Sequence, residues 1–176
     1  DWKIDELLKT ERVVGIVITS PSEKVESYIA QQFNSEKIQF VKRDENLAQL
    51  NTNLSDTLSD VLSKVQNVPY EYLMVLGVEY PFISCKTIND AVNTLSIFKA
   101  DSLVSVRPET SLFFKHDGEG MKPILNMDKF TKLERDALYK NIGGIMLATK
   151  EYFENKSLLS IIFLYTYFLS LVGNYL

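Results

Sequence analysis

Cysteine is nearly absent from this sequence of 176 residues, which contains only Cys85. One cysteine cannot form a disulfide within the chain, and such low usage is typical of a reducing compartment, so we expect a cytoplasmic protein. The sequence begins at Asp1 without methionine, and no signal peptide is visible there. The helical pattern that opens at Trp2 has no lead-in, which predicts a strand upstream of it.

Positive charge is also scarce relative to negative charge. Lys and Arg number 19 against 23 Asp and Glu, for a net charge of −4. Because no basic stripe stands out to bind phosphates, the composition argues against a general nucleic-acid-binding protein. The single histidine, His116, adjoins a predicted turn and has no Ser or Cys nucleophile with a supporting acid beside it, so nothing marks it as a catalytic base.

Internal repeats and low-complexity linkers are lacking too, and 45% of the residues are hydrophobic. This composition is ordinary for a globular chain, so we predict one domain over residues 1–156. The remaining segment, 157–176, is 20 residues without a charge, which is long enough to span a membrane. Its polar and aromatic residues favour packing on protein instead, within the same domain or at an oligomer interface, and no membrane partner is expected.

What the sequence does contain is an alternation of apolar strands and amphipathic helices. An unbroken apolar run at 72–78 predicts a strand buried on both faces, and a second such strand is predicted at 102–106. Between them, apolar residues recur at helical spacing from 88 to 98, which predicts a β-α-β crossover. Because ligands of open α/β sheets bind at the carboxyl ends of strands, residues 77–84 are expected at the rim of a site.

Three further strands complete the predicted sheet. Apolar runs at 13–18 and 38–41 predict a second β-α-β unit, in which the turn residues 19–22 cap the intervening helix. Residues 143–148 return to strand character, and a hairpin is predicted around the turn at 117–120. The predicted fold class is therefore α/β, with one mostly parallel sheet and helices on both faces.

Four short motifs occur in a fixed order along the chain. They are Arg43 with Leu47-Ala48, Pro81-Phe82, Ala100-Asp101-Ser102-Leu103-Val104-Ser105-Val106, and Tyr139-Lys140-Asn141-Ile142-Gly143-Gly144-Ile145. In order and spacing they resemble R-x-x-x-L-A, the P-L of L-Q-P-T-S-P-L, A-D-S-x-x-S-V and Y-x-x-N-G-A-I of the acylneuraminate cytidylyltransferase family. That family makes CMP-linked sugar acids such as CMP-sialic acid from CTP, and the resemblance covers residues 2–159.

The resemblance implies a Rossmann-like nucleotidyltransferase fold and a homodimer. In the implied reaction a sugar-acid oxygen attacks the α-phosphorus of CTP and releases pyrophosphate, with Mg²⁺ and basic residues on the triphosphate. It also implies nucleotide contacts from Arg43, Thr52, Asn53 and Gly77, and contacts with a sugar acid such as N-acetylneuraminate from Lys115, Lys132, Tyr139 and Asn141. Glu79, the only acid at the end of the central predicted strand, is the candidate Mg²⁺ ligand, although a lone carboxylate makes no metal site by itself.

Most of these residues also have a plain structural interpretation. Arg43 is a basic residue in an acidic loop, where solvation alone is common. Thr52 and Asn53 suit turn and cap chemistry. The two lysines, Lys115 and Lys132, suit an exposed surface.

The chain departs from the family at several positions. Gly77 stands where the family has a nucleotide-contacting Gln, Leu50 stands where an Asp is usual, and nothing acidic follows Glu154 to supply a late D-x-D pair. The opening Gly-rich loop with its Arg and Lys is not present in the sequence either. We therefore expect no CMP transfer by this chain alone. Two other functions stay open: a catalytically inactive binding or assembly module with the same fold, and an enzyme for a different base.

Overall fold

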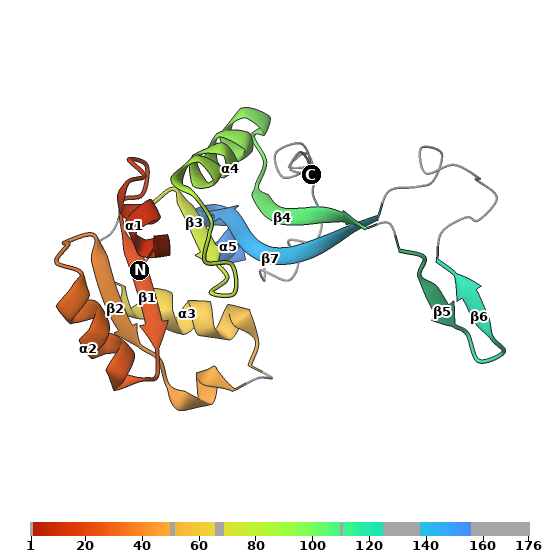
Figure 1. Ribbon diagram of the computed structural model, residues 1–176, viewed down its shortest axis with the longest axis horizontal. Helices are drawn as coiled ribbons and strands as arrows, with labels where there is room; N and C mark the ends of the chain where they lie inside the picture. The colour runs from red at the N-terminus through yellow and green to blue at the C-terminus, as the bar shows by residue number, and fades with distance from the viewer. Residues whose placement is uncertain (1, 50–51, 66–68, 110, 125–137, 156–176) are drawn as a thin grey trace.

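The fold is taken from a computed structural model that describes residues 2–49, 52–65, 69–109, 111–124 and 138–155 (Figure 1). The helices are α1 (Trp2–Leu8), α2 (Glu23–Gln32), the 3₁₀ helix η1 (Glu45–Ala48), α3 (Leu54–Lys64), α4 (Cys85–Phe98) and α5 (Lys150–Asn155). The strands are β1 (Ile16–Ser20), β2 (Ile38–Lys42), β3 (Tyr72–Leu76), β4 (Ser102–Glu109), β5 (Phe114–His116), β6 (Met121–Pro123) and β7 (Leu138–Thr149). The described part of the chain is therefore mixed α/β, as the sequence predicts.

The described strands form three sheets. β1 and β2 pair in parallel, with Ile16 opposite Ile38, and α2 connects them and packs against both. This arrangement confirms the predicted β-α-β unit near the start of the chain. β3, β7 and β4 form a second sheet in which β7 lies in the centre, and β5 and β6 form the predicted hairpin.

The prediction of one mostly parallel sheet is wrong in two respects, because the five predicted strands lie in two sheets, β1-β2 and β3-β7-β4, and β7 does not run parallel to its neighbours. This strand is antiparallel to both β3 and β4, which are therefore parallel to each other but separated by it. The chain leaves β4, passes through the hairpin and re-enters the sheet from the same end, so that Leu138 lies opposite Glu109 (Figure 1). A continuous apolar run indicates burial on both faces but does not encode the direction of a strand, which is why the sequence pattern fails here.

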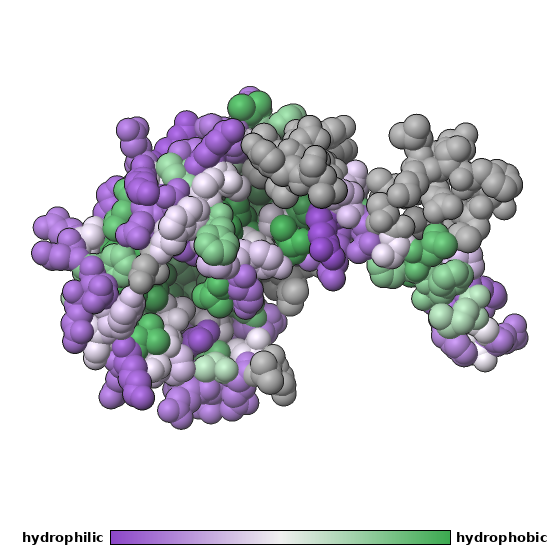
Figure 2. Space-filling view, viewed as in Figure 1, coloured by the Kyte–Doolittle hydropathy of each residue, from purple (hydrophilic) through white to green (hydrophobic). Residues whose placement is uncertain are grey.

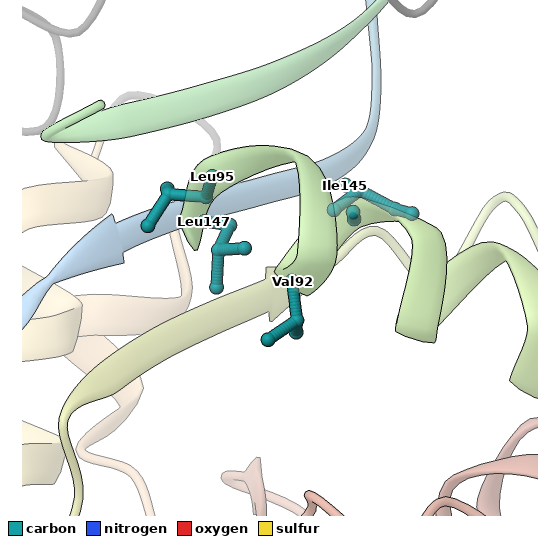
Figure 3. Packing of buried hydrophobic residues seen from close by; sticks show 5 residues of the cluster. Val92, Leu95, Ile145 and Leu147 are labelled. Carbon is teal, nitrogen blue, oxygen red and sulfur yellow. The ribbon is translucent and has the colours of Figure 1, made fainter. Parts of the chain in front are cut away.

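Helix α4 covers one face of the β3-β7-β4 sheet (Figure 3). Val92 and Leu95 of α4 belong to one buried cluster with Ile145 and Leu147 of β7. The two β7 residues are two apart and share a face of the strand, while the two α4 residues are three apart and share a side of the helix. Leu147 is 1% exposed and Leu95 2% exposed, so this contact is the centre of the core.

The opposite face of the same sheet is covered by α3 and α5. Ala148, the residue after Leu147, packs with Tyr152 of α5 and Leu58 of α3. Helices thus lie on both faces of the sheet. This part of the predicted fold is confirmed, because alternation along β7 directs neighbouring residues to opposite faces.

The β5-β6 hairpin projects away from the rest of the described chain (Figure 1). Five large apolar side chains in and beside it are exposed, and they form what we call the hairpin patch (Figure 2): Leu112, Phe113, Phe114, Met121 and Ile124. Two short strands without further packing are marginally stable in water, so this hairpin is expected to gain stability from a contact that covers the patch.

The predicted apolar segment 157–176 lies outside the described residues, and so does Lys132, one of the predicted sugar-acid contacts. Within the part of the chain that is described, no helix has the length and apolar character needed to cross a membrane.

Candidate functional site

A shallow hollow lies where the parallel strands β1 and β2 end. Its volume is about 800 Å³, and it is lined by the first turn of α2, the end of β2 with the residues that follow it, and the last residue of α3. The lining residues are Pro21, Ser22, Glu23, Lys24, Lys42, Arg43, Asp44, Glu45 and Lys64. Open α/β sheets bind ligands at the carboxyl ends of their parallel strands, so this strand-end hollow is the candidate site.

Arg43 is the predicted nucleotide contact that lines the hollow. Its backbone N–H donates to the carbonyl of Ser20 over 3.1 Å, which extends the pairing of β1 and β2 by one residue. Its Nε is buried without a hydrogen-bond partner in the described ranges, and so is Thr19 Oγ1. Because Thr19 pairs with Val41, two residues before Arg43, the two side chains emerge on the same face. Buried polar atoms are normally bonded, so a water or a ligand atom is expected here.

Two of the four cations in the hollow are already paired. Lys42 Nζ lies 2.7 Å from Glu23 Oε1, and Lys64 Nζ lies 2.7 Å from Asp60 Oδ2. The hydrogen bond between Lys42 and Glu23 raises the pKa of the amine and lowers the pKa of the carboxyl, so both groups are charged at neutral pH. Glu45, another carboxylate in the lining, is exposed to solvent.

The other two cations, Lys24 and Arg43, have no ion-pair partner among the residues that the structure describes. Asp44, the carboxylate next to Arg43, accepts the backbone N–H of Asn46 over 2.8 Å and so caps η1. Ser22 begins α2, but its side chain makes no cap hydrogen bond. Two cations and a hydroxyl are therefore available in the hollow, and this donor set suits the oxygens of a phosphoryl group.

Thr52 and Asn53, two other predicted nucleotide contacts, interact with the local backbone. Thr52 Oγ1 donates to the carbonyl of Asn46 over 3.0 Å, and Asn53 Oδ1 accepts from the N–H of Ser55 over 3.4 Å as the N-cap of α3. Neither residue lines the strand-end hollow. Their observed contacts are those of turn and cap residues, and a role in nucleotide binding stays a prediction.

Gly77, the last predicted nucleotide contact, follows β3 and makes a close backbone contact with β7. Its N–H donates to the carbonyl of Gly144 over 3.3 Å. A Cβ at position 77 would lie 2.7 Å from the carbonyl oxygen of Gly143, 3.0 Å from Glu79 Oε2 and 3.3 Å from the ring of Tyr80. A Gln at this position, as the family has, would clash with β7, so residue 77 contributes backbone alone.

β7 bulges opposite this contact, where its register with β4 shifts. Gly143 has a φ of 69°, in the left-handed region that glycine adopts most easily. Its N–H donates to Asn141 Oδ1 over 2.8 Å, and the N–H of Ile145 donates to Ser105 Oγ over 2.9 Å. Asn141, a predicted sugar-acid contact, thus has a structural role in the bulge, and Ser105 links β4 to β7.

Glu79, the candidate Mg²⁺ ligand, lies near a cation. Lys3 Nζ donates to the carbonyl of Gly77. Burial lowers the pKa of Lys3, and the negative charge of Glu79 opposes this effect. In the described residues, no three His, Cys, Asp or Glu side chains lie close enough together to hold a metal ion. Mg²⁺ is usually held by one or two carboxylates together with substrate phosphates, so the role of Glu79 as an Mg²⁺ ligand stays a prediction.

The predicted sugar-acid contacts are spread over the chain. Lys115 lies on the projecting hairpin, opposite Lys122. Tyr139 lies near the start of β7, opposite Pro108, and is 39% exposed. Asn141 follows two residues later in the bulge. Lys115 is exposed, as its surface interpretation predicts, and the sugar-acid role of all three residues stays a prediction.

Lys24 and Thr19 are site candidates that the sequence pattern does not single out. The available signal is the turn at 19–22, which follows a buried strand and begins α2. Such a turn lies at the carboxyl end of a parallel strand, so the rule that places ligands there applies to it as well as to residues 77–84.

No family model matches the sequence, and no match is found among curated proteins. Among solved structures, the chain is similar to the 4-diphosphocytidyl-2C-methyl-D-erythritol synthase from Anaerococcus prevotii, with a TM-score of 0.63 and 16% sequence identity. The likeness covers 93% of this chain and 66% of that one, so this chain spans about two thirds of the length of that protein. At this identity the likeness shows only that the two chains share a fold, and it does not single out the acylneuraminate family.

Proposed function

We propose that this chain is a cytidylyltransferase-like domain that binds CTP at the strand-end hollow and serves CMP transfer to a sugar acid such as N-acetylneuraminate. In this reaction a hydroxyl oxygen of the sugar acid bonds to the α-phosphorus of CTP and loses its proton. The bond from that phosphorus to the oxygen bridging the β-phosphate breaks, and pyrophosphate leaves. The observation that carries the proposal is the guanidinium of Arg43, which lines the hollow with its Nε buried and unpartnered in the described ranges.

The fold and the charges of the hollow support this proposal. The similar solved structure is named for a diphosphocytidyl product. Arg43 also stands in the R-x-x-x-L-A motif of the resembled family, at the carboxyl ends of two parallel strands. Arg and Lys side chains are the common protein partners of phosphate oxygens, and Lys24 adds a second cation without an ion-pair partner in the described chain.

Replacing Arg43 with Ala should weaken CTP binding about tenfold, because a hydrogen bond to a charged group contributes on the order of 1.5–3 kcal/mol. Isothermal titration calorimetry at one fixed salt concentration measures the change, since such contacts are screened by ions. Arg12→Ala is the matched control, because Arg12 is exposed and does not line the hollow. Equal weakening by both variants, or no binding of CTP to the unaltered chain, would contradict the proposal.

A catalytically inactive binding or assembly module is the second candidate. The close contact at Gly77 favours it, because this contact leaves no room for the nucleotide-contacting Gln of the family. Pyrophosphate release with CTP, Mg²⁺ and a panel of sugar acids separates the two functions. We expect release at background from this chain alone, and turnover above background would identify it as a transferase. Titrations with UTP and ATP test whether cytosine is the preferred base.

We propose that the homodimer implied by the family resemblance forms through the hairpin patch. The double substitution Phe113→Ser and Phe114→Ser should then halve the mass measured by light scattering. Phe113 is 42% exposed and Phe114 is 44% exposed, and both would lose their apolar contact with the second copy of the chain. Ile97→Ser is the control, since Ile97 is 75% exposed on α4 and outside the patch. A monomer mass for the unaltered chain at micromolar concentration would rule this interface out.

A further inference from the structure

Helix α1 lies against the loop 77–84, which joins β3 to α4. Three of its side chains, those of Trp2, Lys3 and Glu6, contact this loop or the first residue after it. We call these three contacts the α1 clasp. The hydrogen bond of Lys3 joins residues that are 74 positions apart in the sequence, and that of Glu6 joins residues 79 positions apart. No local sequence pattern therefore indicates these contacts.

Glu6 makes the central contact of the clasp. Its Oε2 accepts the backbone N–H of Cys85 over 2.8 Å, and its Oε1 lies 2.6 Å from Lys9 Nζ. N–H groups in the first turn of a helix lack partners within the helix; here Ser84 Oγ accepts from Thr87, and Glu6 provides the acceptor for Cys85. The residue is only 9% exposed. These two hydrogen bonds lower the pKa of the Glu6 carboxyl, so it is ionised at neutral pH.

The other two contacts hold the loop at its beginning and near its end. Lys3 Nζ donates to the carbonyl of Gly77, and the rings of Trp2 and Phe82 pack in a T-shaped arrangement at a centroid distance of 5.8 Å. Within the loop, Ile83 packs against the buried cluster between α4 and β7, whereas Val78 is 83% exposed and Phe82 81% exposed. The loop's own side chains therefore constrain its end at Ile83, and the contacts with α1 add constraints at its beginning and at Cys85.

We propose that α1 positions the loop 77–84 against the bulge of β7 and that Glu6 is the positioning residue of this clasp. Opening of α1 would release the loop from Gly77 to Cys85. The buried cluster between α4 and β7 would remain, because it contains no residue of α1. The proposal goes beyond the function proposed above, and its test needs no nucleotide.

Amide hydrogen exchange of the full chain, read by mass spectrometry over residues 77–86, tests the clasp. Glu6→Ala should accelerate exchange in this segment about tenfold. This is the loss of protection expected when a helix N–H loses a charged hydrogen-bond acceptor. Exchange in β7 should stay unchanged. Glu6→Gln should restore most of the protection, because its amide oxygen can accept the same N–H of Cys85. If Glu6 acted through packing alone, the protection of residues 77–86 would not depend on an acceptor for the N–H of Cys85.

Reactivity of the only cysteine gives a second readout. Cys85 is partly buried beside the clasp, and its reaction with a thiol reagent should accelerate in Glu6→Ala together with amide exchange. Glu11→Ala is the matched control, because Glu11 is exposed on the same N-terminal segment. Three results would overturn the proposal: unchanged exchange in folded Glu6→Ala, an equal effect of Glu11→Ala, or acceleration that extends equally to β7.

Discussion

Replacing Leu147 with Ala is expected to lower the free energy of unfolding by about 2–5 kcal/mol. Leu147 is 1% exposed near the carboxyl end of β7, where it packs with Ala91, Val92 and Leu95 of α4 in one cluster. Truncation removes the transfer energy of the lost atoms and leaves a cavity that β7, paired on both sides, cannot collapse to fill. Urea unfolding followed by circular dichroism measures the difference.

Ile97→Ala provides the comparison for this substitution. Ile97 is also a branched aliphatic residue, but it is 75% exposed on α4, so its truncation should change stability by no more than about 0.5 kcal/mol. If the two variants lose equal stability, the sheet and α4 are not packed as described, and the position of β7 between β3 and β4 would need revision.

Introducing the Gln that the resembled family has at position 77 is expected to destabilise the chain by about 3 kcal/mol, the upper part of the usual range for overpacking. The Cβ would lie 2.7 Å from the carbonyl oxygen of Gly143. That oxygen cannot move away easily, because Asn141 and Ser105 bond the backbone on either side of it. Thermal unfolding of Gly77→Gln measures the effect.

Gly120→Gln is the matched control for position 77. A Cβ at Gly120 meets nothing within 4 Å, so the same substitution should be nearly neutral there. A Gly77→Gln variant as stable as the unaltered chain would show that the bulge of β7 adapts. The Gln could then take the nucleotide contact that it makes in the family, and enhanced CTP binding by this variant would be the consequence.

Much of the fold follows from local patterns. The apolar run at 72–78 predicts β3, the helical spacing from 88 to 98 predicts α4, and the turn at 117–120 predicts the β5-β6 hairpin; all three are present. In the candidate site, Arg43 is predicted from its motif and lines the hollow. The other predicted contacts that the structure describes do not line this hollow, because short motifs resemble a family without specifying which side chains share one surface.

Local patterns in the chain specify the order of strands and helices, the burial of α4 and β7, and the motif around Arg43, because apolar periodicity and turn residues act over a few neighbouring positions. The antiparallel direction of β7, the need for glycine at 77, and the contact of Glu6 with Cys85 arise from packing between distant segments. Each of these depends on backbone groups far apart in the chain that meet when the sheet and α1 pack. Their partners cannot be identified from the residues around them.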